Sequence, residues 1–276
     1  MSFGYTRFYA GPVQAVIFDW AGTTIDFGSM APIHAFCSLF EVNGVPITLA
    51  EAREPMGTEK REHISRLLAL PRIRDAWATA HGQAPNESDI DRLYADFVPM
   101  QIASIAERAQ LIPGAKATFD YLDERGIAIG ANTGYSQEMI AELLPLAAAQ
   151  GYRPSSNVCA TDVPRGRPFP HMTLKNMLDL EIEAVQGVVK VDDTLTGIEE
   201  GLNAGCWTVG VAISGNEVGL DLAAWEALDA GEQELRRTAA CQRFRSAGAH
   251  YVIDSVAELP SVIEDIEARL AQGEQP

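Results

Sequence analysis

Polar side chains that could transfer a phosphoryl group stand at the ends of three apolar segments. Asp19 follows the first segment and precedes a turn that is rich in Gly and Thr. Thr133 follows a second segment, and the adjacent carboxylates Asp192 and Asp193 follow a third. Open parallel sheets bind ligands at the carboxyl ends of their strands, so parallel strands would bring these groups together. A single Asp at such a point is often only a turn residue, and the prediction therefore depends on the recurrence.

Such a cluster would suit attack of a carboxylate on phosphorus. The hydroxyl of Thr133, with backbone N–H groups at the start of a helix, would hold phosphoryl oxygens. Because Asp19 and its target are both anionic, a cation must reduce their repulsion. Mg²⁺ prefers oxygen ligands and is the expected cofactor. Ala21, two residues after Asp19, can offer the cation only its backbone carbonyl.

Short apolar segments alternate with amphipathic ones along most of the chain, as in repeated βαβ units. Helical spacing predicts helices over 114–125, 136–150 and 194–204. The sequence therefore predicts an α/β fold, with a Rossmann-like parallel sheet core flanked by helices. The strands are expected at 13–19, 127–132, 157–160, 187–191, 206–211 and 250–253, with 157–160 the weakest.

The stretch 28–106 interrupts this alternation. It has a helical pattern nearly throughout, with Pro and Gly at its breaks and no strand pattern. We predict an inserted helical cap domain over 28–106 and a core domain made of residues 1–27 and 107–276. A second irregular region, 214–249, also has a helical pattern.

The bulk composition narrows the function class. With 276 residues, of which 47% are hydrophobic, the chain can form one large domain or a core with a smaller second domain. The net charge of −17 argues against binding to nucleic acid or to an anionic membrane. The four cysteines form no C-x-x-C pair and no zinc spacing. With neither a secretory signal nor an apolar run of roughly 20 residues, we expect a cytoplasmic protein.

Five sequence segments together resemble one known family. They are Phe18-Asp19-Trp20-Ala21-Gly22-Thr23-Thr24, Pro55-Met56-Gly57 with Lys60 and His63, Asn132-Thr133-Gly134-Tyr135, Asp162-Val163-Pro164 with Gly166-Arg167-Pro168, and Asn203-Ala204-Gly205 with Trp207-Thr208-Val209-Gly210. On these segments the chain resembles the phosphonoacetaldehyde hydrolase (phosphonatase) family, a capped branch of the haloacid dehalogenase-like superfamily. The resemblance extends over about 13–266, whereas the first segment alone would indicate only the superfamily.

The resemblance implies a reason for Ala21. In most of the superfamily the nucleophilic Asp is followed, two residues later, by an Asp that protonates the leaving group. In the phosphonatase family a cap-domain lysine instead forms a Schiff base with the substrate aldehyde, and the matching residue here is Lys60. The protonated imine accepts the electrons of the P–C bond, so the carbon leaves as an enamine and needs no acid beside the nucleophile.

Local sequence alone favours a different interpretation of Lys60. It stands in a charged run, which is usually a solvated helix face. Met56, Lys60 and His63 are spaced i, i+4 and i+7, so a continuous helix would place them on one face. Such a face could hold Lys60 in a partly desolvated position and favour its neutral amine. His63 could relay protons in the substrate site or be an ordinary polar helix residue.

Other site residues follow from the resemblance. Arg167, rather than Arg165, is expected to contact the phosphoryl group, where a cation compensates developing charge. Thr133 matches the phosphoryl-binding Thr of the family. Tyr135 matches its substrate-site Tyr, although a packing role is also open. Lys190 could be a second cation or a structural residue.

Two positions depart from the family pattern. The family usually has Gly at the position of Asp192, and often a second Asp at the position of Gly197. The resemblance therefore implies metal ligands only at Asp19, at Asp193 and at the backbone carbonyl of Ala21. Asp192 could replace the missing carboxylate or only add negative charge.

The resemblance implies hydrolysis of the P–C bond of phosphonoacetaldehyde to acetaldehyde and phosphate, in the breakdown of 2-aminoethylphosphonate. It also implies a homodimer formed through the cap domain. Two alternatives stay open: a phosphatase or mutase acting on a sugar phosphate, against which Ala21 argues, and a degenerate domain that only binds phosphate-like ligands.

Overall fold

A computed structural model describes residues 9–276 of the chain. At its centre is a parallel sheet of six strands in the order β3-β2-β1-β4-β5-β6. The chain adds strands first on one side of β1 and then on the other, so the order reverses between β1 and β4. The strands are β1 (Ala15–Phe18), β2 (Ala128–Thr133), β3 (Ser156–Cys159), β4 (Val188–Asp192), β5 (Trp207–Val211) and β6 (Tyr251–Ile253).

The predicted sheet is confirmed. Each expected strand is present, and its ends lie within two residues of the expected ones. Every residue of β1, β4 and β5 is buried. Helices cover both faces of such a sheet, which explains why these segments are continuously apolar instead of alternating.

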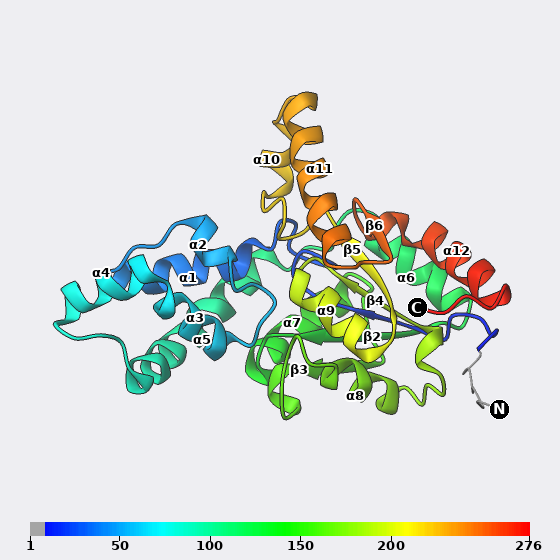
Figure 1. Cartoon of the computed structure of the whole chain (residues 1–276), viewed down its shortest axis with the longest axis horizontal. Helices are drawn as coiled ribbons and strands as arrows, with labels where there is room; N and C mark the ends of the chain where they lie inside the picture. The colour runs from blue at the N-terminus through cyan, green and yellow to red at the C-terminus, as the bar shows by residue number, and fades with distance from the viewer. Residues whose placement is uncertain (1–8) are drawn as a thin grey trace, which may run out of the picture.

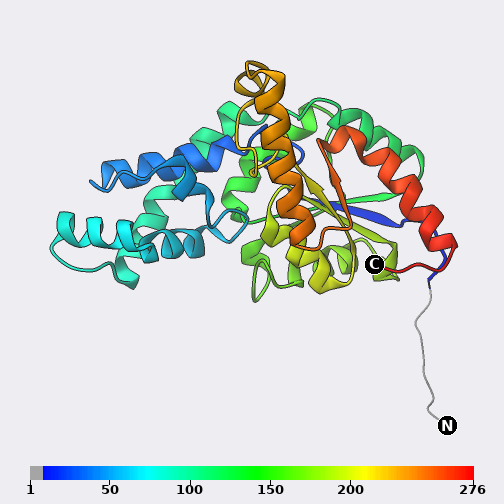
Figure 2. The ribbon, with the colours of Figure 1, turned by 45° about the horizontal axis from the view of Figure 1, so that its top comes forward.

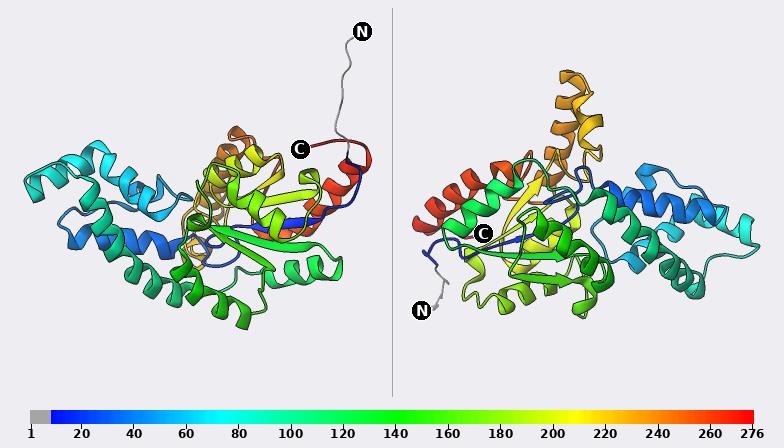
Figure 3. Two further views of the ribbon diagram at one scale, coloured as in Figure 1. Left: turned by 90° about the horizontal axis from the view of Figure 1, so that it is seen from below. Right: turned by 180° about the vertical axis from the view of Figure 1, so that it is seen from behind.

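The core helices cover the two faces of the sheet as right-handed crossovers require. Helices α8 and α9 pack on each other, and α12 packs on α6. Figures 2 and 3 show these two pairs on opposite sides of the sheet. The core helices that flank the sheet are α6 (Ala115–Glu124), α7 (Gln137–Ala149), α8 (His171–Asp179), α9 (Leu195–Ala204) and α12 (Leu259–Ala271).

Most of the segment between β1 and β2, from 30 to 108, forms a helical lobe beside the sheet (Figure 1). Its interior includes the stacked rings of Phe36 and Phe97, whose centroids are 4.3 Å apart. The first lobe helix begins at Met30 and the last ends at Arg108, while the boundaries of a cap domain at 28 and 106 remain a prediction. The lobe helices are α1 (Met30–Val42), α2 (Leu49–Arg53), α3 (Lys60–Ala69), α4 (Pro71–His81) and α5 (Glu87–Arg108).

The second irregular region is helical only in part. Its helices are α10 (Leu222–Glu226) and α11 (Ala230–Ser246), which stand out from the core at the top of Figure 1. The prediction of helix is wrong for 214–221, because this stretch is a loop whose Gly219 has a φ of +67°. Within residues 9–276, no helix has the length and apolar character needed to cross a membrane.

Candidate active site

The register of the sheet brings the predicted strand-end groups together. Phe18 is paired with Ala131 on β2 and with Val191 on β4. The residues that follow Phe18, Ala131 and Val191 are Asp19, Asn132 and Asp192. These three residues therefore lie side by side across the sheet, at the point where the strand order reverses. The backbone N–H of Asp19 continues the ladder by donating to the Val191 carbonyl at 2.9 Å.

A small cavity lies over these strand ends, between the sheet and the helical lobe. Its volume is about 20 Å³, which is room for roughly one water molecule. The lobe therefore lies closed against the core, and substrate must enter by an opening of the two. The cavity is lined by Asp19, Ala21, Ser29, Pro32, Met56, Gly57, Lys60, Thr133, Gly134, Tyr135, Arg167, Asp193 and Thr194. All of the predicted site residues are among them except His63.

Lys60 enters this cavity from the lobe. It is the first residue of α3, and its side chain is only 3% exposed, unlike those of the neighbouring Arg61 and Glu62. The alternative of a solvated charged face is therefore wrong for Lys60. Its ammonium nitrogen lies 5.2 Å from the centre of the Tyr135 ring and 5.7 Å from that of Phe36. Burial lowers the pKa of Lys60 to about 8, although the nearby Asp19 carboxylate acts in the opposite direction.

The predicted common helix face is wrong for Met56. Helix α2 ends at Arg53 and α3 begins at Lys60, so Met56 lies in the turn between them. Gly57 in this turn has a φ of +86°, and a Cβ there would overlap the hydroxyl groups of Thr194 and Thr196. The turn therefore reaches the cavity because a residue without a side chain lets its backbone lie against the core.

His63 lies behind the cavity, inside the lobe. Its Nε2 hydrogen bonds to the Ala52 carbonyl at 2.9 Å, and its ring stacks on Phe36 with the centroids 3.9 Å apart. Burial, together with the charge of Lys60, lowers the pKa of His63 well below its usual value. The imidazole is therefore neutral and packs beside the site instead of lining it.

Arg167 is the cation closest to Asp19. Its Nη2 donates to Asp19 Oδ1 at 2.7 Å and lies 3.1 Å from Asp192 Oδ2. Burial acts to lower the pKa of Arg167, but the charges of Asp192, Asp19 and Glu200 outweigh it and raise that pKa. Arg165 is exposed and stacks on Phe169, so of the two predicted candidates only Arg167 reaches the cavity.

Three carboxylates could hold a metal ion here. Asp19, Asp192 and Asp193 each offer an oxygen within 4.8 Å of the others. Burial, followed by the charges of Asp19 and Asp192, raises the pKa of Asp193 well above its usual value. A pKa raised by neighbouring carboxylates indicates negative charge that a divalent cation would compensate. The oxygen donor set fits a hard ion of the Mg²⁺ type.

Asp192 differs from Asp193 in the charge of its partners: it faces the cations Lys190 and Arg167, whereas Asp193 accepts from the neutral hydroxyl of Thr23 and the backbone N–H of Asn216. Asp192 Oδ1 accepts from the backbone N–H and the hydroxyl of Thr194, at 3.0 and 2.7 Å. Oδ2 accepts from Lys190 Nζ at 2.7 Å and faces Arg167. A Cβ at Gly197 would overlap this carboxylate. The Asp192 side chain thus fills the space that a side chain at position 197 would need, which explains how the two departures from the family pattern occur together.

Sequence reasoning missed one charged residue of the site, Glu200. It lies on α9, its side chain is buried, and it accepts from Arg167 Nε at 3.0 Å. A signal was present in the sequence. In the predicted helix 194–204, Glu200 shares a face with Gly197, Gly201 and Ala204. A face of such small residues packs closely against the core, so a charged residue on it is expected to be buried.

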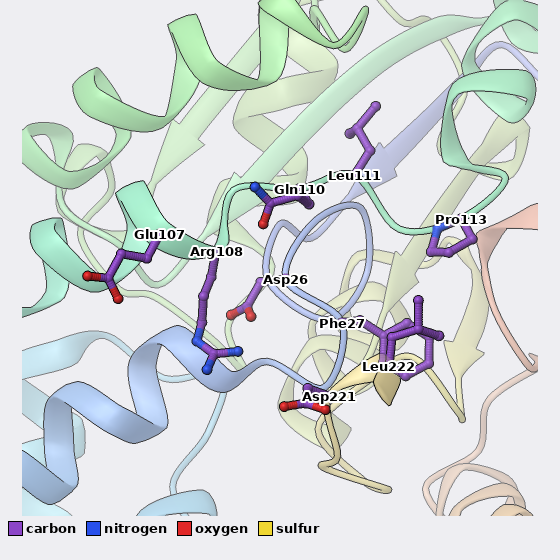
Figure 4. Close-up of a pocket in the computed structure, with 9 residues that line it drawn as sticks. All are labelled: Asp26, Phe27, Glu107, Arg108, Gln110, Leu111, Pro113, Asp221 and Leu222. Atoms are coloured by element: carbon purple, nitrogen blue, oxygen red, sulfur yellow. The ribbon is translucent and has the colours of Figure 1, made fainter. Parts of the chain in front are cut away.

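A wider cavity of about 420 Å³ lies away from the strand ends (Figure 4). Its walls include Asp26 and Phe27 from the link between β1 and α1, Arg108 from the last turn of α5, and Gln110 from the link that follows. The first link has positive φ values at Asp26 and Ser29, of 54° and 52°. This cavity marks where the chain crosses between core and lobe, and none of the predicted site residues lines it.

Comparison with known proteins shows the family to which the chain belongs. The chain matches the haloacid dehalogenase-like hydrolase family over residues 13–205. A β-phosphoglucomutase from Thermotoga maritima, described as putative in its structure report, is 21% identical with a TM-score of 0.56, covering 91% of this chain and 99% of its own, and shares the fold alone. The fold and the site thus define a haloacid dehalogenase-like hydrolase.

Closer relatives narrow the family. A phosphonoacetaldehyde hydrolase from Hahella chejuensis is 61% identical over all of this chain and 94% of its own length. One from Paraburkholderia phytofirmans is 52% identical over 96% of this chain and 99% of its own. The crystal structure of a phosphonoacetaldehyde hydrolase-like protein from Oleispira antarctica is 59% identical, with a TM-score of 0.98 and full coverage of both chains. The chain belongs to the phosphonoacetaldehyde hydrolase family of enzymes.

Proposed function

We propose that this enzyme hydrolyses the P–C bond of phosphonoacetaldehyde to acetaldehyde and phosphate, in the breakdown of 2-aminoethylphosphonate. The observation that carries the proposal is that a buried lysine and a buried aspartate from different lobes line one cavity. Lys60 comes from the helical lobe and Asp19 from the sheet, while position 21 has no carboxyl group. These are the groups needed for covalent chemistry at both ends of a phosphonate that carries an aldehyde.

The carbon end reacts first. The neutral amine of Lys60 adds to the aldehyde, the adduct takes up one proton from solvent, and water leaves, which gives a protonated imine. One carboxylate oxygen of Asp19 then forms a bond to phosphorus as the P–C bond breaks. The electron pair of that bond moves into the iminium group and gives an enamine on Lys60. Protonation of the enamine carbon and hydrolysis of the imine release acetaldehyde and the free amine.

The phosphorus end completes the cycle. The phosphoryl group remains on Asp19 as an aspartyl-phosphate, and water releases phosphate from it. Arg167 and the hydroxyl of Thr133 would hold the phosphoryl oxygens, because both line the cavity beside Asp19. Tyr135 and Met56 would enclose the carbon fragment next to Lys60.

A divalent cation, which we propose is Mg²⁺, would bind to Asp19, to Asp193 and to the carbonyl of Ala21. It would supply positive charge between the nucleophile and the phosphonate. Asp192 is omitted from this set because its charge is already paired with the ammonium of Lys190 and the guanidinium of Arg167. Accordingly, chelation should abolish phosphate release and Mg²⁺ should restore it, whereas Asp192→Gly should leave the Mg²⁺ affinity measured by calorimetry nearly unchanged.

Borohydride trapping tests the proposed function directly. Reduction during turnover should convert the imine to a stable secondary amine and add a two-carbon unit to the peptide that contains Lys60. Lys60→Arg should block both trapping and turnover, because guanidinium keeps the charge but stays protonated and forms no imine. Lys116→Arg is the matched control, since Lys116 is exposed and pairs with Asp120 on the surface.

The outcomes separate the alternatives. An ordinary phosphatase or a phosphate-binding domain would give no adduct and only a mild effect of Lys60→Arg. An adduct on Lys190 would keep the Schiff base and refute Lys60. The same preparations also test the proposed homodimer, because sedimentation should give twice the chain mass, and the mass of a single chain would refute it.

A further inference from the structure

Arg167 lies in a segment with little structure of its own. The short helix η1 (Ala160–Asp162) ends before it and α8 begins after it at His171. No helix or strand therefore fixes the direction of this long side chain, although its guanidinium is buried and contacts Asp19. Its direction must come from the groups that surround it.

Glu200 is the residue that contacts the other edge of the guanidinium. Its Oε2 accepts from Arg167 Nε at 3.0 Å. Its Oε1 accepts from the backbone N–H and the hydroxyl of Thr173, at 3.0 and 2.9 Å, and from Asn132 Nδ2 at 2.9 Å. Helix α9 and these donors hold the carboxylate rigidly, and the hydrogen bonds offset the cost of burying its charge.

The same carboxylate orients a second partner of Arg167. By accepting from the Nδ2 of Asn132, Glu200 turns the Oδ1 of that amide toward Arg167 Nη2, which donates to it at 2.7 Å. Lys190 Nζ donates to the same Oδ1 at 2.9 Å. Because a guanidinium is planar, anchoring its Nε edge and one Nη2 contact fixes the plane in which its remaining N–H groups point.

We infer that Glu200 is a positioning residue, which sets the plane of Arg167 and so directs its N–H groups toward the phosphoryl site. Glu200 does not line the cavity, so it acts through Arg167 and does not touch the substrate. The inference rests on the proposed function only in assigning Arg167 to the phosphoryl group. It adds a residue that neither the motifs of the family nor the strand ends indicated.

The test measures the affinity for inorganic phosphate at a fixed Mg²⁺ concentration, by calorimetry. Glu200→Gln keeps the shape but loses the charge, and we expect phosphate affinity to fall by about 10- to 100-fold, as for loss of a charged hydrogen bond. Glu199→Gln is the matched control: it makes the same change on the adjacent residue of α9, whose side chain is exposed. It should stay within about twofold of the parent.

A double-mutant cycle separates positioning from a structural role. In an Arg167→Lys background, the further change Glu200→Gln should cost no additional phosphate affinity, because the group that Glu200 orients is gone. An equal loss in both backgrounds would overturn the inference, as would parent-like affinity of folded Glu200→Gln. If Glu200→Gln does not fold, Glu200→Asp takes its place in the test. The shorter Asp side chain keeps the negative charge but holds it farther from the Nε of Arg167. This variant should lose about 3- to 10-fold, and an unchanged affinity would overturn the inference in the same way.

Phosphate is a probe that does not depend on the substrate assignment. A loss of phosphate affinity in Glu200→Gln would support the inference even if no adduct forms at Lys60. Conversely, an adduct at Lys60 with unchanged phosphate affinity in Glu200→Gln would keep the proposed function and refute the inference.

Discussion

The carboxylate of Asp19 has two requirements at once. For the proposed attack on phosphorus it must be ionised, yet it is buried beside two other carboxylates, and burial raises its pKa. The ion pair with Arg167 acts in the opposite direction. The proposed nucleophile therefore depends on cations. Arg167 pairs with it in this structure, and a bound metal ion would compensate the charge of the neighbouring Asp193.

Asp19→Asn should reduce phosphate release below detection while leaving the fold intact. An amide is a poor nucleophile and a poor ligand for Mg²⁺, so two functions are lost together. Phosphate release is measured on protein whose mass shows no deamidation. Asp120→Asn, at an exposed position in α6, should retain parent activity. Near-parental turnover of Asp19→Asn would show that another residue attacks phosphorus.

The pH dependence of imine formation should follow Lys60. With a pKa lowered to about 8, roughly one tenth of this amine is neutral at pH 7, far more than for an ordinary lysine. The rate of borohydride-trapped adduct formation should therefore rise about tenfold between pH 7 and 9 and level off above about pH 9, because only the neutral amine attacks. A midpoint near the ordinary lysine value would show that burial does not tune this amine.

At the scale of single elements, the sheet was predictable and several helices were not. Strands buried on both faces are continuous apolar runs, so their positions could be derived from composition alone. Helices α8 and α12 were not predicted, although α12 buries Val262, Ile263 and Ile266 at helical spacing. Neither helix has a side-chain N-cap, so the sequence carries no clear signal of where each one starts.

Within the site, residues from the sheet could be placed from the sequence, whereas residues from the lobe could be placed only in part. The strand-end residues could be placed from sequence because parallel register alone aligns them. The position of Met56 could not, because a turn at Gly57 replaces the continuous helix that the i, i+4, i+7 spacing assumed. His63 keeps its helical position but faces Phe36, and which neighbour a helix face meets is decided by tertiary packing.

Strand β4 and helix α9 should be coupled through Asp192 and Gly197. In the parent chain, Gly197→Ala should destabilise the protein by about 3 kcal/mol, because the new Cβ overlaps a buried carboxylate. In an Asp192→Gly background the same change should be neutral or stabilising by up to about 1 kcal/mol, since Ala favours a helix over Gly. Free energies of unfolding from urea titrations give the coupling.

Gly231→Ala, at an exposed position in the first turn of α11, is the control for that cycle. Its effect should be equal in both backgrounds, because it contacts neither partner. If Gly197→Ala costs as much without Asp192 as with it, the carboxylate does not occupy the space at position 197 and the structural account of the two departures fails.

At the scale of the whole molecule, the active site exists only while the lobe lies on the core. Lys60 and Met56 come from the lobe, while Asp19 and Asp193 come from the sheet. The small cavity that they share cannot admit substrate unless the lobe moves away. The proposed catalysis therefore requires the lobe to move away from the core at the two links, before α1 and after α5. It also requires contacts that favour the closed form.

Arg53 provides the clearest contact of that kind. It ends α2 in the lobe, and its Nη1 donates to the Gly28 carbonyl and to Asn216 Oδ1, both at 3.0 Å. Its Nη2 donates to the Gly219 carbonyl at 2.9 Å. The backbone N–H of Asn216 in turn donates to Asp193 Oδ2 at 2.8 Å. A single lobe side chain is thus linked through one core loop to a carboxylate of the proposed metal site.

Arg53→Met should lower kcat/KM for phosphonoacetaldehyde by about 10- to 100-fold, since it keeps the length of the side chain but removes its hydrogen bonds to the core loop. Because the closed form would be less populated, backbone amides at the first link should also exchange hydrogen faster in the free enzyme. Arg66→Met is the matched control, because Arg66 is a lobe residue whose ion pair, with Glu62, lies on the surface. Parental kinetics and exchange in Arg53→Met would mean that other contacts, such as that of Gly57 against Thr194 and Thr196, hold the lobe closed.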